Sequence, residues 1–232
     1  MTAAIPALSI IVPVLNEAHG LAAALAPLQV FRQRGVRLVV VDGGSEDGSL
    51  AVSQAFCDHA VSAPRGRASQ LNAGAAACPA ATFLFLHADT RLPANADVLV
   101  HNALNSGRAW GRFDARIDSD RPLLAIVSRA MNLRSRWTGI ATGDQAIFVA
   151  QEAFAAVGGF ADIALMEDIV ISRALKRMGP PVCLREVVYI SARRWERHGI
   201  LRTIFLMWRL RAEFFFGANP DDLAREYGYR PR

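Results

Sequence analysis

The sequence predicts an α/β fold with a central, mixed but mainly parallel sheet, and two observations support this class. Apolar, β-branched runs at 8–14 and 38–42 each stop at a polar turn, as buried parallel strands do. Helical stretches follow at 18–31 and 49–56, and such alternation is typical of parallel strands with right-handed connections. Because the 232 residues contain no clear linker, we expect a single domain over residues 1–232.

The same alternation continues to the middle of the chain. Small, Ala-rich residues at 67–78 predict a helix that packs closely on the sheet, and 81–86 is typical of a third buried strand. A helix is expected at 95–106. The strand expected at 111–117 alternates polar and apolar residues, which indicates that one of its faces is exposed.

The second half of the chain has a less regular pattern. Helices are expected at 123–136 and at 168–178, with a strand at 146–149 between them, so the sheet is predicted to become mixed here. At 199–216, apolar and aromatic residues recur at helical spacing among arginines, which predicts an amphipathic helix. A helix of this kind commonly covers a core or a dimer partner, and it also suits the surface of an anionic membrane.

Composition narrows the possible partners. The net charge is +5, and Lys176 is the only lysine among 26 basic residues; arginine-rich surfaces suit anionic small ligands. No basic tract with interleaved aromatic residues occurs, which argues against nucleic acid as a partner. Cys57, Cys78 and Cys183 match no metal or redox spacing, so we expect buried thiols in a reducing compartment. With no signal-peptide pattern and no long apolar run, a cytoplasmic location is expected.

Polar residues stand at the ends of the predicted strands. Asn16 and Glu17 follow the first strand and Asp42 ends the second, at the sheet edge where open α/β folds bind ligands. The alternative is that these residues only cap the helices that follow. Neither a G-x-G-x-x-G sequence after the first strand nor a phosphate-binding P-loop occurs, which argues against dehydrogenases and P-loop enzymes.

The third strand ends in His87-Ala88-Asp89-Thr90. A carboxylate at this edge can hold Mg²⁺ or Mn²⁺ together with substrate phosphates, because such sites often use only one or two protein carboxylates. The alternative is that Asp89 caps a turn before Pro93. The residues by themselves leave both interpretations open.

Taken in order, these motifs resemble those of the glycosyltransferase family 2 enzymes, which have the Rossmann-like GT-A fold of nucleotide-diphospho-sugar transferases. The resemblance rests on V-P-V-L-N-E at 12–17, V-V-D-G-G-S-E-D-G-S at 40–49, His87-Ala88-Asp89 in place of the D-x-D motif, and Glu167-Asp168. It extends over about residues 8–195. Pieces such as L-H-A-D-T, G-D-Q, L-M-E-D and S-A-R-R-W further resemble the subgroup named for arsenosugar biosynthesis.

The resemblance implies an inverting sugar transfer from a nucleotide diphosphate sugar, most simply a UDP sugar, to a small-molecule or lipid-linked acceptor. It divides the domain into a nucleotide-sugar-binding half at 8–118, an acceptor and catalytic half at 119–196, and a carboxyl-terminal amphipathic helix and tail at 197–232. The last segment is the one that could contact the inner face of a membrane. The alternatives are a nucleotidyltransferase and a non-catalytic nucleotide-sugar-binding protein.

The resemblance also implies roles for residues on the donor side. The residues implied in nucleotide binding are Pro13, Leu15, Glu17, Asp42, Gly43 and Arg67. Asp89 would bind the metal that bridges the diphosphate. His87 stands where the family has its first acidic residue, and a histidine ligand would favour Mn²⁺ over Mg²⁺.

On the acceptor side, Asp168 lies in the first turn of its predicted helix, where the helix dipole stabilises a carboxylate. The resemblance makes Asp168 the general base, with Glu167 orienting the base or the acceptor; alternatively the pair merely begins a helix. Gly143, Asp144 and Gln145 are implied on the acceptor side.

Arg194 and Trp195 resemble the end of the Q-x-x-R-W motif, and Arg194 would neutralise the leaving diphosphate. Ser191 stands where that motif has Gln, which argues against a processive synthase. The alternative for Arg193 and Arg194 is a solvated basic patch.

Overall fold

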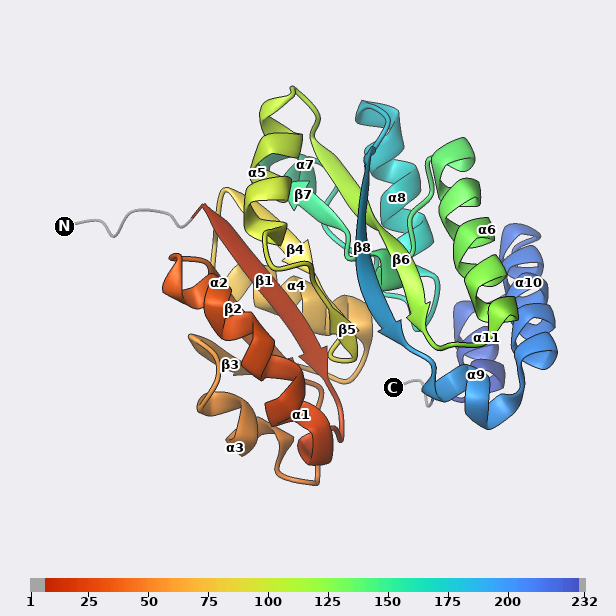
Figure 1. Cartoon of the computed structure of the whole chain (residues 1–232), viewed down its shortest axis with the longest axis horizontal. Coiled ribbons are helices and arrows are strands. Elements are labelled where there is room, and N and C mark those ends of the chain that lie inside the picture. The colour runs from red at the N-terminus through yellow and green to blue at the C-terminus, as the bar shows by residue number, and fades with distance from the viewer. Residues whose placement is uncertain (1–6, 230–232) are drawn as a thin grey trace.

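The computed structural model describes residues 7–229 and contains one eight-stranded sheet with helices on both faces (Figure 1). The strand order is β3-β2-β1-β4-β7-β6-β8-β5. The strands are β1 Leu8–Val14, β2 Arg37–Asp42, β3 His59–Ser62, β4 Thr82–Phe85, β5 Thr90–Arg91, β6 Trp110–Asp118, β7 Phe148–Ala150 and β8 Val182–Ser191.

The helices comprise eleven α segments and two short 3₁₀ turns within the described residues. They are α1 Ala18–Leu25, η1 Ala26–Leu28, α2 Gln29–Gln33, α3 Ser49–Gln54, α4 Arg67–Ala77, α5 Ala96–Asn105, α6 Pro122–Thr138, η2 Gly143–Gln145, α7 Gln151–Ala156, α8 Glu167–Met178, α9 Arg193–His198, α10 Ile200–Phe215 and α11 Pro220–Tyr227.

The first four strands form the parallel part of the sheet. β1 lies between β2 and β4, with Ile10 opposite both Leu38 and Leu84. Their side chains are almost completely buried, as their continuous apolar sequences predict. The short edge strand β3 was not predicted, because none of its four residues is fully buried and it carries no apolar run.

The rest of the sheet is mixed. β7 pairs antiparallel with β4 and with β6, whereas β8 runs parallel to β6 and antiparallel to β5. β8 was missed by the sequence prediction, because only Val188 and Ile190 of its ten residues are fully buried. The expected α/β class with a mixed, mainly parallel sheet is confirmed.

Several helices differ from their predicted extents. The helix expected at 18–31 is divided into α1, η1 and α2, because Pro27, in the first turn of η1, cannot donate a backbone hydrogen bond. The helices expected at 123–136, 168–178 and 199–216 are confirmed as α6, α8 and α10. The short helices α7, α9 and α11 were not predicted.

Two apolar clusters fix the sheet between its helical layers. Ile10 and Val12 of β1 contribute to one cluster, and Ile11 contributes to the other on the opposite face. Cys57 and Cys78 are buried, Cys183 is half-buried, and all three are free thiols. Across residues 7–229, no helix has the length and apolar character needed to cross a bilayer.

Candidate active site

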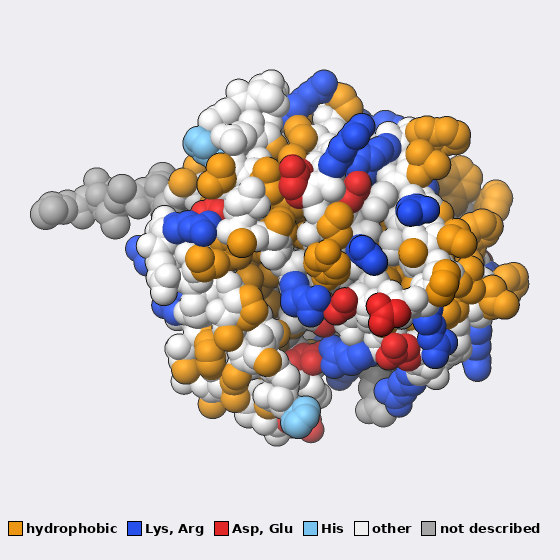
Figure 2. Space-filling view, viewed as in Figure 1, with side chains coloured by type: hydrophobic (Ala, Val, Ile, Leu, Met, Phe, Trp, Pro, Cys, Tyr) orange, Lys and Arg blue, Asp and Glu red, His pale blue; other side chains and the backbone are white. Residues whose placement is uncertain are grey.

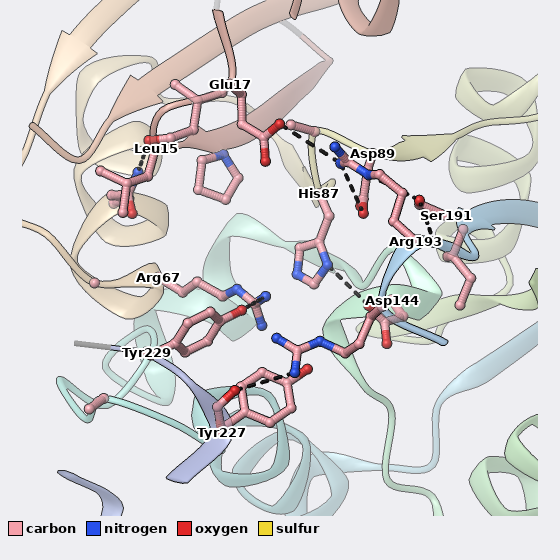
Figure 3. A pocket seen from close by; sticks show the side chains of 18 of the residues that line it. Leu15, Glu17, Arg67, His87, Asp89, Asp144, Ser191, Arg193, Tyr227 and Tyr229 are labelled. Carbon is pink, nitrogen blue, oxygen red and sulfur yellow. Dashed lines mark hydrogen bonds and ion pairs between the residues drawn. The ribbon is translucent and has the colours of Figure 1, made fainter. Parts of the chain in front are cut away.

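A pocket of about 670 Å³ opens at the carboxyl ends of β1, β4 and β8 (Figure 3). It brings together residues that are far apart in the chain and that were predicted separately. The predicted site residues that line it are Pro13, Leu15, Glu17, Arg67, His87, Asp89, Asp144, Arg194 and Trp195. The convergence of strand ends therefore places donor-side, metal and acceptor-side candidates around one space.

The acidic end of β2 lies behind this pocket rather than in its lining. Asp42 is 3 % exposed, and its Oδ2 accepts hydrogen bonds from the backbone N–H groups of Gly44 and Ser45 at 3.0 and 2.9 Å. Its Oδ1 is buried and has no hydrogen-bond partner among residues 7–229. Asp42 thus keeps one free acceptor oxygen at this edge of the sheet.

Gln70 of α4 joins the ends of β1 and β2. Its Nε2 donates hydrogen bonds to the carbonyl oxygens of Val14 and Val41, at 2.9 and 2.7 Å. A Cβ at Gly43 would lie 3.0 Å from the Gln70 side chain, so glycine allows this close approach. Gln70 lines the pocket but was not among the predicted residues, since nothing in a small, Ala-rich helix indicated it.

Arg193 lies between two carboxylates at the mouth of the pocket (Figure 3). Its Nη2 is 3.8 Å from Glu17 Oε2 and 3.7 Å from Asp89 Oδ2. Burial raises the pKa of Glu17, and the charge of Arg193 partly offsets that shift. The sequence allowed Arg193 to be part of a solvated basic patch. The structure pairs it instead with two predicted site residues, Glu17 and Asp89.

His87 contacts Asp144 rather than standing free in the pocket. Its Nδ1 lies 3.2 Å from Asp144 Oδ1, and a Cβ at Gly143 would lie 2.6 Å from its Nε2. Burial raises the pKa of Asp144, but the hydrogen bond from His87 and the charges of His87, Arg67 and Arg211 outweigh it and lower the pKa to about 2. Both ring nitrogens of His87 thus face protein groups.

Few side chains in the pocket lie close enough together to act as ligands of one metal ion. In the part of the chain that the structure describes, no three His, Cys, Asp or Glu side chains are grouped to hold an ion. The Asp89 carboxylate is 41 % exposed in the pocket, so it can contribute oxygen ligands. This arrangement fits a hard cation that takes one protein carboxylate and completes its shell with substrate oxygens.

A second cavity, of about 60 Å³, adjoins the first and shares Arg67, His87, Asp144 and Tyr227 with it. Asp168 lines this smaller cavity. Its Oδ2 accepts a hydrogen bond from the Gly143 N–H at 2.9 Å, and its Oδ1 accepts one from Ile169 N–H at 2.7 Å. The start of η2 and the start of α8 are held together through this carboxylate.

The other predicted acceptor-side residues are divided between the small cavity and the interior. Gly143 and Glu167 line the small cavity, whereas Gln145 is fully buried and lines neither cavity. Its Oε1 accepts a hydrogen bond from the Thr142 N–H at 3.2 Å. Gln145 thus stabilises the turn that presents Gly143 and Asp144.

Glu167 is buried beside Arg67. Its Oε1 lies 4.0 Å from Arg67 Nη1 and its side chain is 5 % exposed. Burial, together with the charge of Asp168, raises the pKa of Glu167 to about 7, although Arg67 acts in the opposite direction. A carboxyl group that changes protonation near neutral pH therefore lies next to the predicted base.

Two tyrosines from the end of the described chain close one side of the pocket (Figure 3). Arg67 donates a hydrogen bond to the Tyr229 hydroxyl, and Arg194 stacks on the Tyr227 ring at 3.8 Å from its centre. Burial raises the pKa of both tyrosines. Sequence reasoning missed them, because no local signal connects a tyrosine after α11 with an arginine at the start of α4.

The chain is similar to known proteins in sequence and in fold. The sequence model described as "Glycosyl transferase family 2" matches residues 9–139, which is more than half of the chain. Comparison with curated proteins gave no match.

Three solved structures illustrate the fold. The mannosyltransferase PcManGT from Pyrobaculum calidifontis, in complex with GDP-mannose and Mn²⁺, has a TM-score of 0.66 at 16 % identity over 96 % of this chain and 68 % of its own. S. aureus TarS 1–349 with UDP-GlcNAc has a TM-score of 0.63 at 15 % identity, over 80 % of this chain and 58 % of its own.

The third structure is glucosyl-3-phosphoglycerate synthase from Mycobacterium tuberculosis in complex with Mn²⁺, UDP and glucosyl-3-phosphoglycerate. It has a TM-score of 0.58 at 16 % identity, over 80 % of this chain and 70 % of its own. The chain thus spans between about three fifths and seven tenths of these structures.

Proposed function

The chain belongs to glycosyl transferase family 2, and from this premise we propose that it transfers a sugar, with inversion, from a UDP-linked donor to an acceptor hydroxyl. The observation that carries the proposal is the 670 Å³ pocket, in which Glu17, Asp89, Asp144 and Arg194 converge. Pockets of this size suit a ligand as large as a nucleotide sugar. The narrower likeness to the subgroup named for arsenosugar biosynthesis stays a prediction.

On the donor side, we assign the base and ribose to Pro13, Leu15 and Glu17, which line the pocket at the end of β1. Asp42 and Gly43 lie behind the pocket lining, so their role in holding the nucleobase through the unpartnered Oδ1 of Asp42 stays a prediction. One structural relative holds GDP-mannose and another holds UDP-GlcNAc. The experiment below therefore compares donors with different nucleobases.

We assign the divalent cation, Mn²⁺ or Mg²⁺, to Asp89 and to oxygens of the diphosphate. Two relatives hold Mn²⁺, which supports a metal of this kind. His87 was the second predicted ligand, but its contact with Asp144 supports a different role, in which it orients that carboxylate. When bound, the cation supplies positive charge to the leaving diphosphate.

The proposed reaction is a single displacement at the anomeric carbon. Asp168 accepts the proton of the acceptor hydroxyl, whose oxygen forms the new bond to the anomeric carbon as the bond to the diphosphate oxygen breaks on the opposite face. Arg194 offsets the charge that develops on the diphosphate. Glu167 is paired with Arg67, which lines both cavities, and we assign it to positioning that arginine between them. Gly143 and Asp144 are assigned to the acceptor side.

The acceptor is proposed to be a small molecule or a lipid-linked molecule, used in the cytoplasm or at the inner face of a membrane. A nucleotidyltransferase is less well supported, because the turn at 13–17 has no Gly-rich, basic loop for a triphosphate. The remaining alternative is a protein that binds a nucleotide sugar without turnover. A measurement of both binding and release separates this last alternative from the proposal.

The test is nucleotide release from UDP, GDP and dTDP sugars in Mn²⁺ or Mg²⁺. We expect metal-dependent release from a UDP sugar, lost in Asp89→Ala and reduced by about 10²- to 10⁴-fold in Asp168→Asn. Asp118→Asn is the matched control, since Asp118 is exposed and pairs with Arg91 outside the pocket. Nucleotide binding without release, equal in wild type and Asp168→Asn, would support the binding protein; no binding of any nucleotide would refute both.

A further inference from the structure

Helices α6 and α10 present large apolar side chains to solvent on one side of the molecule. Trp137 is 83 % exposed, and Phe205 and Trp208 are 71 % and 72 % exposed. We call this surface the α6–α10 face; its residues are Leu123, Ile126, Leu133 and Trp137 of α6, Leu201, Phe205, Trp208 and Phe215 of α10, and Phe216. Monomeric soluble proteins rarely expose a continuous apolar surface of this kind.

The spacing of these residues shows that they form outward stripes rather than a badly packed core. In α10, positions 201, 205, 208 and 215 recur at helical intervals, whereas Thr203 and Leu210 on the opposite side are buried. In α6, the buried positions Leu124, Ser128 and Ser135 likewise lie between the exposed ones. Among residues 7–229, each helix therefore contributes one face to the protein interior, and most of its other face is exposed to solvent.

The two stripes belong to one region of the surface. Figure 1 shows α6 and α10 beside each other at one edge of the molecule, and Figure 2 shows the apolar side chains gathered over them. Arg134 of α6 and Arg211 of α10 are close enough that, after burial, the charge of Arg211 is the main influence that lowers the pKa of Arg134, to about 10. The exposed aromatic residues thus form one face.

The charge of these helices is strongly one-sided. Together α6 and α10 contain six arginines and a single acidic residue, Glu213, which is a net charge of +5 for the two helices. Arg136 is paired with Asp114, and Arg209 is paired with Glu226. The whole chain also has a net charge of +5, which means that the remaining residues balance to zero. Arg129 and Arg202 are exposed on the two helices. An apolar, aromatic surface with this charge is complementary to an anionic bilayer.

We propose that the α6–α10 face binds the surface of an anionic membrane, with its tryptophan and phenylalanine side chains in the headgroup region. Aromatic rings are favoured at that depth, and arginine guanidinium groups bind lipid phosphates through paired hydrogen bonds. The binding does not depend on the proposed transfer reaction. It brings the proposed reaction to a membrane surface, because Met207 places α10 in the wall of both cavities.

The test is flotation of the full chain with vesicles of phosphatidylcholine alone or of phosphatidylcholine mixed with phosphatidylglycerol. We expect the protein to float with the anionic vesicles only, and to lose binding by about tenfold or more in Phe205→Ser/Trp208→Ser and in Arg129→Glu/Arg202→Glu. Val98→Ser is the matched control, because Val98 is 51 % exposed on α5, away from this face. Thermal unfolding of each variant checks that it is folded.

Two results would overturn the proposal. One is no flotation with anionic vesicles, or flotation that the double variants do not change. The other is a wild-type dimer that Phe205→Ser/Trp208→Ser converts to a monomer in light scattering, because the face would then be the contact between two copies. Nucleotide release by the same variants in detergent-free solution is measured separately, so that failure of the transfer reaction and failure of membrane binding are distinguished.

Discussion

The β1–β4 region (residues 8–85) and the β6–β8 region (residues 110–191) form one sheet by different means. In the first, β1, β2 and β4 are parallel strands with continuous apolar sequences that bury both of their faces, and polar residues follow their ends. In the second, strands run in both directions and Arg112 is completely buried, with hydrogen bonds to Ser135 and Asn132 and an ion pair with Asp114. The first region is specified by its apolar sequence pattern, and the second depends on polar contacts between side chains that this pattern does not show.

Glycines test this difference most strongly, because each region has one at a close contact. In Gly111→Ala of β6, the new Cβ would lie 2.5 Å from the backbone oxygen of Val182 and 2.4 Å from Phe148 Cζ. In Gly74→Ala of α4, it would lie 2.5 Å from the Ile11 side chain and 2.9 Å from that of Val41. Side chains can move more easily than a paired strand.

We therefore expect Gly111→Ala to lower the free energy of unfolding by about 3 kcal/mol or more, and Gly74→Ala by about 1–3 kcal/mol. Urea unfolding measures both. Gly20→Ala in α1 is the control: its Cβ would meet nothing within 4 Å, so stability is expected to rise by about 0.5–1 kcal/mol. Equal losses at Gly111 and Gly74 would contradict the difference between the regions.

The same difference explains which parts could be predicted from the sequence. Glu17, Asp42 and Asp89 could be placed at one edge, because parallel strands bring their carboxyl ends together. The pairing of His87 with Asp144 joins positions 57 residues apart, and that of Arg67 with Tyr229 joins positions 162 apart; neither has a local signal. Strand periodicity identifies β1 and β2 but not the half-exposed β8.

Carboxyl groups in the two regions should change the free energy of unfolding in opposite directions as pH rises. The pKa of Glu167 is raised from 4.5 to about 7, so between these pH values the unfolded chain releases a proton that the folded chain keeps. Glu167 therefore lowers stability as pH rises through this range. We expect Glu167→Gln to be more stable than wild type at pH 8, by up to about 3 kcal/mol, and equally stable near pH 4.

Asp58, in the first region, has a lowered pKa, in contrast to Glu167. Burial raises its pKa, but hydrogen bonds from Arg32 and from the Leu38 N–H lower it below the usual value of 3.8. The Asp58→Asn variant should thus be less stable than wild type at neutral pH. Its stability should approach that of wild type as pH falls through the pKa of Asp58 in the folded state. Melting temperatures from pH 3 to 8 measure both, with the exposed Glu152→Gln as control. A Glu167→Gln variant no more stable than wild type at pH 8 would contradict the assignment.

The smallest effect is expected in the pocket, where Arg67 of the first region contacts Tyr229 near the end of the described chain. Tyr229→Phe removes the hydroxyl that accepts a hydrogen bond from Arg67, while the ring keeps its place 5.1 Å from the guanidinium carbon. A single hydrogen bond is worth about 1 kcal/mol, so the KM for the donor should rise about fivefold with kcat nearly unchanged. Donor titrations of nucleotide release measure the two constants separately.

Tyr189→Phe is the matched control for this change, because Tyr189 also lies against an arginine, Arg91 at 5.5 Å, but on β8 outside the pocket lining. Its kinetics should equal those of wild type. If Tyr229→Phe instead lowers kcat and leaves KM unchanged, the hydroxyl contributes only in the transition state. Arg67 would then contact the reacting groups themselves, rather than only help to bind the donor between the two cavities beside Glu167.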